Sequence, residues 1–73
     1  MLGESKKSVL KFEGMLKTNT NYYFDSTEFI NITHYYIDSA NFSLAEKAIS
    51  MGLQQHPSNI DLMLLNSELL IFN

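Results

Sequence analysis

The 73-residue chain has no cysteine, so no disulfide can cross-link it and no thiolate can bind a metal or attack a substrate. Its three glycines stand apart from one another, which excludes a glycine-rich loop for binding phosphate. A chain of this length forms one small domain at most, and a small domain without cross-links has little core stability to spare. We therefore expect the chain to associate with another protein or to form part of a longer one.

Basic residues are scarce and unevenly placed. All five are lysines, against eight acidic residues, and the formal net charge is -3. Residues 18–73 contain six of the acidic residues and a single lysine, Lys47, so this segment carries a net charge of -5. A nucleic-acid-binding protein usually presents a basic surface that neutralises phosphates. We therefore expect no nucleic-acid partner.

Long hydrophobic runs are also missing. The first ten residues, MLGESKKSVL, contain no apolar segment as long as that of a signal peptide. The most apolar stretch, IDLMLLNSELLIF, is too short to cross a bilayer and carries Asp61 and Glu68. The sequence therefore predicts a cytoplasmic protein that does not act at a membrane.

The chain does contain the patterns of about four helices, with almost no strand signal, which predicts an all-α fold. The first helix is expected over about 4–17, where Val9, Phe12 and Leu16 recur at helical spacing and lysines occupy the other face. Thr and Asn residues, which favour turns, follow this segment.

The start of the second helix has the clearest local signal, in the segment FDSTEF. Asp25 and Glu28 have the spacing of a capping box, in which each side chain bonds the backbone of the other. Phe24 and Phe29 flank the box as a hydrophobic staple does. These two signals predict a helix that begins after Asp25 and ends near residue 39.

The third helix is expected over about 42–55, with small residues at Ala45, Ala48 and Gly52 along one side. The segment HPSN ends it, because the residue before a proline is pushed out of helical geometry. The fourth helix is expected over about 59–72, with Ser58 as its cap.

The fourth helix is apolar nearly all round, and such a helix should be buried on most sides. Four short helices cannot easily surround one of their own number. We therefore predict a homo-oligomer formed through this helix, or packing against a following repeat. The residues predicted to make this contact are Leu62, Leu65, Leu69 and Phe72.

Large and small residues follow a fixed spacing over the second and third helices: Phe29, Ile32, Tyr36, Phe42, Ala45, Ile49, Gly52 and Pro57. In this register the sequence resembles the tetratricopeptide repeat, a 34-residue helix pair. It departs from the family at Thr33, at Ile49 and at Ala40, where glycine is usual. With alanine at this turn, Asn41 is expected to take the left-handed conformation.

From this resemblance we expect residues 1–73 to form a single module. Residues 1–21 form an amphipathic helix and a linker, residues 26–59 form one repeat, and residues 60–73 form the first helix of a second, incomplete repeat. The segments FEGML, NYYFDSTEF and GLQQHP also resemble the N-terminal part of bacterial tetratricopeptide proteins that have no settled biochemical role.

The resemblance implies an α-solenoid scaffold without catalytic activity, in which first helices line a concave groove for a peptide or partner helix. The residues placed on this face are Thr27, Ile30, His34, Ile37 and Asp38, joined by Leu64 and Glu68 of the last helix. Residues 18–46 contain no lysine or arginine, so the groove would suit an apolar or basic peptide. In the alternative interpretation, these residues only pack on a neighbouring repeat or chain.

Chemistry-bearing residues do not form a recognisable set. His34 and Asp38 share a helix face, but no third ligand or nucleophile is in register, so we predict a surface hydrogen bond and no catalytic, cofactor or metal site. His56 is interpreted as a turn residue. Two other functions stay open: a helix-turn-helix nucleic-acid binder, disfavoured because the third helix carries only Lys47 against Glu46, and a non-catalytic subunit of an enzyme complex.

Overall fold

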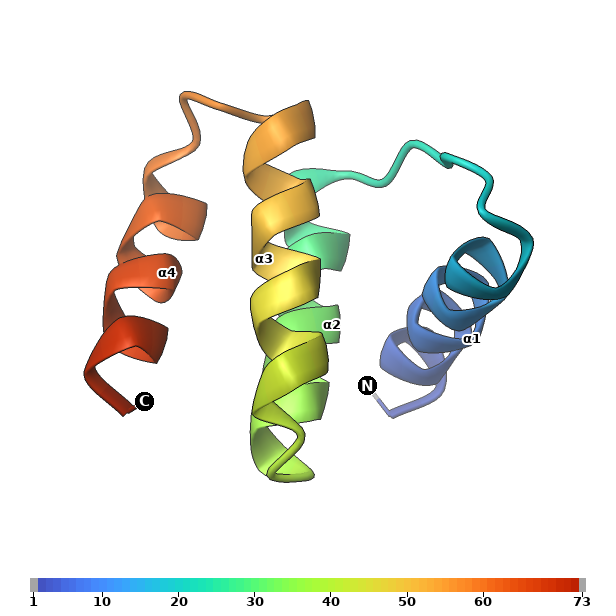
Figure 1. Ribbon diagram of the computed structural model, residues 1–73, viewed down its shortest axis with the longest axis horizontal. Coiled ribbons are helices and arrows are strands. Elements are labelled where there is room, and N and C mark those ends of the chain that lie inside the picture. The colour runs from blue at the N-terminus through green and yellow to red at the C-terminus, as the bar shows by residue number, and fades with distance from the viewer. Residues whose placement is uncertain (1, 73) are drawn as a thin grey trace.

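The computed structural model describes residues 2–72, with the side chains of residues 6–71. These residues form four helices and no strand: α1 (Leu2–Thr18), α2 (Ser26–Asp38), α3 (Phe42–Gln55) and α4 (Ile60–Phe72). Successive helices alternate in direction, and α1 and α4 lie at opposite edges with α2 and α3 between them (Figure 1). α1 packs against α2, whereas α4 packs against both α3 and α2. The predicted all-α fold is confirmed.

The start of α2 has the predicted capping box. The Glu28 carboxylate accepts a hydrogen bond from the backbone N–H of Asp25 at 3.0 Å. Its second oxygen accepts from the Ser8 hydroxyl at 3.1 Å, which ties the cap to α1. The rings of Phe24 and Phe29 lie 5.2 Å apart across the cap, so the predicted hydrophobic staple is also confirmed.

α1 is held to α2 by aromatic packing and one polar contact. Phe12 is fully buried, and its ring centroid lies 6.4 Å from that of Phe24 and 6.1 Å from that of Tyr36. The Tyr36 hydroxyl donates to Glu13 Oε2 at 2.7 Å. Burial, followed by this hydrogen bond and the Glu13 charge, raises the pKa of Tyr36 above its ordinary value of 10.0.

α2 and α3 approach closely because small residues line α3 at the contact. Ala45 and Gly52 are buried, and a Cβ atom built on Gly52 would lie 3.0 Å from Cγ of Phe29. Thr33 is also fully buried, and its hydroxyl donates to the Phe29 carbonyl oxygen at 2.7 Å. The apolar core draws on all four helices and the linker before α2: Val9, Phe12, Met15, Phe24, Phe29, Ile32, Tyr36, Ala45, Ala48, Ile49, Leu62, Leu65 and Leu69.

The turn between α2 and α3 corrects one prediction. Ala40, not Asn41, takes the left-handed conformation, with φ of 58°. Asn41 has φ of -99° and serves as the N-cap of α3, where its side-chain oxygen accepts from the Leu44 backbone N–H at 3.4 Å. Asn41 stabilises α3 as its N-cap and therefore cannot also take the left-handed conformation. Ala40 takes this conformation instead, despite the steric cost of its Cβ atom.

The cap of α4 corrects a second prediction. Asn59, not Ser58, supplies the cap, because its Oδ1 accepts from the Leu62 backbone N–H at 3.0 Å. Ser58 lies in the exposed turn after Pro57. Both residues are good capping residues, and the extent of the turn after the proline decides between them.

The linker before α2 is fastened to the end of α3. Gln55 Oε1 accepts from the Phe24 backbone N–H at 3.0 Å, and Gln55 Nε2 donates to the Tyr22 carbonyl oxygen at 2.7 Å. His56 Nε2 lies 2.7 Å from the Phe24 carbonyl oxygen, which accepts a hydrogen bond. His56 therefore lies in the turn, as predicted, and also fixes a segment more than thirty residues away.

Candidate functional site

A groove of about 410 Å³ lies between α2 and α4. α2 contributes Ile30 and His34, which are four residues apart on one helix face. The lining residues of α4 are Asp61, Leu64, Leu65 and Glu68. Their spacing also follows one face of a helix, so each wall of the groove is a single rigid element.

The orientation of α4 is set by the part of it that enters the core. Leu62 and Leu69 are 0% and 1% exposed, and Leu65 is 6% exposed at the floor of the groove. The neighbouring face of the helix therefore turns toward α2, which leaves Leu64 at the mouth, 57% exposed.

The rim of the groove is acidic. Asp61 and Glu68 are exposed and lie seven residues apart, two turns along α4. Neither α2 nor α4 contains a lysine or arginine that would offset the carboxylates. The groove thus combines an apolar floor with a rim that attracts positive charge.

Only part of the predicted concave face lies in this groove. Ile30 and His34 line it, together with Leu64 and Glu68. The other three residues do not: Thr27 lines a separate hollow against α1, Ile37 is half-buried on the core, and Asp38 is exposed at the end of α2.

Two further details differ from the expected site. Asp61 and Leu65 line the groove although they were not predicted to do so, and the signal that could have identified them is their helical spacing from Leu64 and Glu68. His34 and Asp38 are both exposed, and within residues 6–71 no hydrogen bond joins their side chains.

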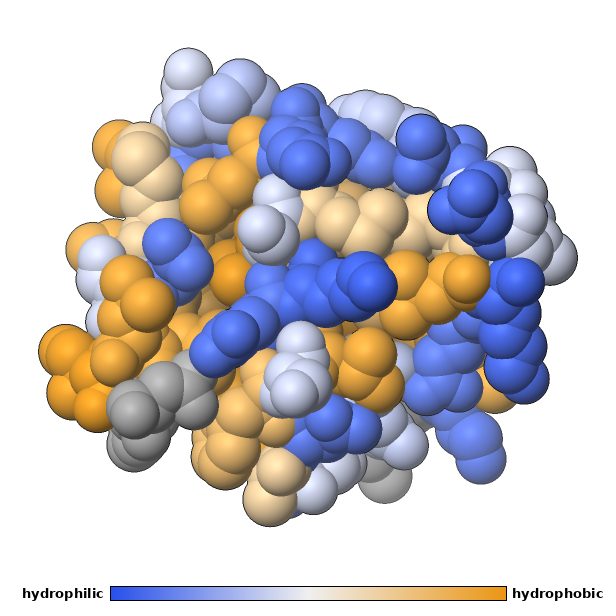
Figure 2. All heavy atoms as spheres, in the orientation of Figure 1, coloured by the Kyte–Doolittle hydropathy of each residue, from blue (hydrophilic) through white to orange (hydrophobic). Residues whose placement is uncertain are grey.

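The α4 residues predicted to contact a partner occupy a different place. Leu62, Leu65 and Leu69 are buried inside this chain, and the Phe72 side chain lies outside the described residues. The large apolar residues that α4 leaves exposed are Ile60, Met63, Leu64, Leu70 and Ile71. Figure 2 shows hydrophobic side chains gathered along the edge of the molecule that α4 forms in Figure 1.

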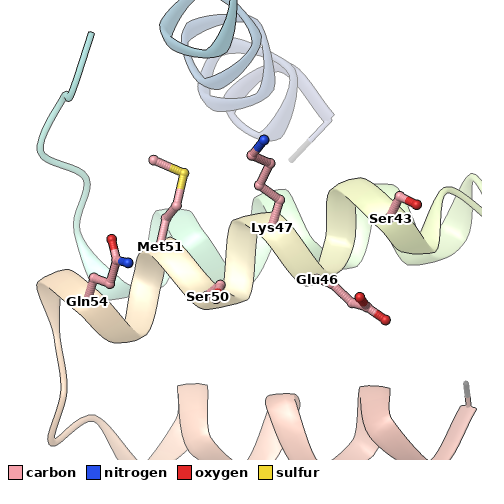
Figure 3. A pocket seen from close by; sticks show the side chains of 6 residues that line it. All are labelled: Ser43, Glu46, Lys47, Ser50, Met51 and Gln54. Carbon is pink, nitrogen blue, oxygen red and sulfur yellow. The ribbon is translucent and has the colours of Figure 1, made fainter. Parts of the chain in front are cut away.

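A third hollow, of about 440 Å³, lies on the outer face of α3. Its lining residues all belong to this one helix: Ser43, Glu46, Lys47, Ser50, Met51 and Gln54. Figure 3 shows that the side chains diverge, with Lys47 and Met51 directed toward α1 and Glu46 toward α4. Side chains that diverge on a mostly polar helix face do not converge on a ligand, so we do not regard this hollow as a site.

Among the residues that the structure describes, no three acidic or histidine side chains come together as metal ligands would. None of the described helices combines the length and apolarity that a bilayer crossing needs. Searches against protein-family models, curated proteins and solved structures found no match to this chain.

Proposed function

We propose that this chain is a non-catalytic interaction module of the tetratricopeptide type, and that the groove between α2 and α4 takes a peptide segment bearing apolar and basic side chains. The observation that carries the proposal is the composition of the groove. Ile30, Leu64 and Leu65 provide apolar surface, and Asp61 and Glu68 of α4 border it, with no lysine or arginine on either α2 or α4.

The arrangement of helices supports the type of module. α2 and α3 form a pair that is closely packed at Gly52, and α4 packs against both of them. This matches what a repeat over residues 26–59 followed by the first helix of another would require. Ile30 on α2 and Leu64 on α4 then lie on one surface, as first helices do in such a stack.

The physical chemistry of the groove defines its ligand. Burying an aliphatic side chain against Leu65 and Ile30 contributes about 0.8 kcal/mol for each methylene removed from water. A lysine or arginine beside that side chain would face Asp61 or Glu68, which favours the correct ligand and speeds its association. An acidic peptide would meet repulsion from the same rim.

A pair of labelled peptides tests the proposal by fluorescence anisotropy. The first is a short peptide that contains leucine and lysine, and the second has glutamate in place of each lysine. We expect the lysine peptide to bind and the glutamate peptide to bind at least tenfold more weakly. Glu68→Gln should lower the affinity for the lysine peptide several-fold and reduce the salt dependence of this binding.

Glu46→Gln is the matched control, because it removes the same charge from α3 outside the groove. Its affinity for the lysine peptide should equal that of the wild-type chain. Equal affinity for the two peptides, or equal effects of Glu68→Gln and Glu46→Gln, would show that this groove does not select basic ligands.

A further inference from the structure

The side of α4 that faces away from the core is apolar. Ile60, Met63, Leu64, Leu70 and Ile71 lie on it and are between 43% and 83% exposed. Their spacing of three, four and seven residues places them on one side of the helix around the exposed Ser67, and we call this side the α4 outer face. A cluster of exposed apolar side chains on one helix face is a feature of surfaces that contact another protein.

The side of α1 that faces away from the core carries most of the basic residues of the protein. Leu10 is 59% exposed there, and Lys6, Lys7 and Lys17 are exposed around it. A Cβ atom built on Gly14 would have no heavy atom within 4 Å, so the space beside this residue is open. We call this surface the α1 outer face.

The two outer faces complement each other in charge and in hydrophobicity. The α4 outer face is bordered by Asp61 and Glu68, and α4 has no basic residue. The α1 outer face has exposed lysines beside an exposed leucine and a glycine. We infer that the α4 outer face of one molecule packs against the α1 outer face of a second copy of this chain.

The geometry of the fold permits this contact to repeat. α1 and α4 form opposite edges of the molecule (Figure 1), and of the other described helices only α2 packs against α1. Each molecule therefore presents both outer faces at once. A contact between two different faces is heterologous, so it extends into a row or closes into a ring instead of stopping at a dimer.

A symmetric pair of α4 helices is the competing arrangement, and charge disfavours it. Pairing α4 with α4 would bring two sets of Asp61 and Glu68 into one interface without a lysine from either helix. The two arrangements differ in their response to salt. Screening weakens contacts between opposite charges, whereas it relieves repulsion between like charges.

Sedimentation velocity on the full chain measures the association. We expect the average mass to rise with protein concentration beyond that of a dimer, and the association to weaken at least several-fold from about 0.05 M to about 0.5 M salt. A chain that stays monomeric throughout, or that stops at a dimer strengthened by salt, would overturn the inference.

Charge-reversal variants identify the faces. Lys6→Glu with Lys7→Glu should give a monomer, and glutamates near the start of α1 suit the helix dipole, so folding is kept. Asp61→Lys with Glu68→Lys should also give a monomer. Mixing these two double variants should restore association, because each supplies the charge that the other now needs.

The apolar part of the contact has its own variant. Met63→Gln with Ile71→Gln keeps good helix formers on α4, leaves the groove residues unchanged, and should weaken association at least tenfold. If the lysine substitutions on α4 unfold the chain, this variant still tests whether the α4 outer face takes part in the association. The inference would be contradicted if the Lys6→Glu, Lys7→Glu variant associated as the wild-type chain does. It would also be contradicted if both charge variants were monomeric and did not associate when mixed.

Discussion

Replacing Gly52 by alanine tests the close contact between α3 and α2. The added Cβ atom would lie 3.0 Å from Cγ, 3.1 Å from Cβ and 3.3 Å from Cδ2 of Phe29. Carbon atoms pack best at about 3.5–4.0 Å, so the new methyl group is several tenths of an ångström too close. Phe29 cannot swing away easily, because it is fully buried and its ring lies against Phe24 and His56.

Two opposing effects set the magnitude. Overpacking a well-filled core costs about 1–3 kcal/mol, and we take about 2 kcal/mol for a contact with two atoms at the base of the ring. Alanine in place of glycine in a helix interior contributes about 1 kcal/mol in the other direction. Gly52→Ala should therefore lower the free energy of unfolding by about 1 kcal/mol, equivalent to about 4–8 °C in Tm for a domain of this size.

Gly14→Ala is the matched control. Gly14 also lies inside a helix, α1, but a Cβ atom there meets nothing within 4 Å. Only the gain in helix propensity remains, so this variant should be more stable by about 1 kcal/mol. Urea unfolding followed by circular dichroism, at one protein concentration, measures both. A Gly52→Ala variant as stable as Gly14→Ala would refute the close contact between α3 and Phe29.

Three further predictions concern single residues. Ala40→Gly should raise the free energy of unfolding by about 1 kcal/mol in urea titrations, because glycine adopts the positive φ of this turn without steric cost. Asn59→Ala should lower it by about 1 kcal/mol through loss of the α4 cap, whereas Ser58→Ala should change it by less than about 0.5 kcal/mol. Stability measured against pH should fall above pH 10, because the unfolded chain then loses the Tyr36 proton that the folded chain keeps. Tyr36→Phe should abolish this fall and cost about 1 kcal/mol at neutral pH, since Glu13 loses its donor.

Local signals predicted the helices well where the deciding residues are neighbours in the sequence. Asp25 and Glu28 fixed the start of α2 because a capping box needs only residues three apart. The predictions that failed, at Asn41 and Ser58, were each wrong by one residue. There two adjacent residues could serve the same purpose, and the three-dimensional course of the turn selected one of them.

The candidate site was harder to predict because α4 has no polar face. An amphipathic helix shows which side enters the core, whereas α4 is apolar on both the buried and the exposed side. The sequence therefore indicated that α4 needs extra cover, but it assigned Leu62, Leu65 and Leu69 to that contact. Packing inside the chain uses these three residues, and a different stripe is left exposed.

The same two carboxylates border both proposed contact surfaces of α4. Asp61 and Glu68 lie at the rim of the groove and beside the α4 outer face, so a lysine from a peptide and a lysine from α1 of a second copy would compete for them. Binding at the two surfaces should therefore be mutually weakening, and such coupling is reciprocal. An excess of the lysine peptide should lower the average mass in sedimentation, and the Lys6→Glu, Lys7→Glu monomer should bind that peptide more tightly than the assembled wild-type chain. If the peptide binds and the average mass does not change, the peptide and the second copy do not compete for these carboxylates.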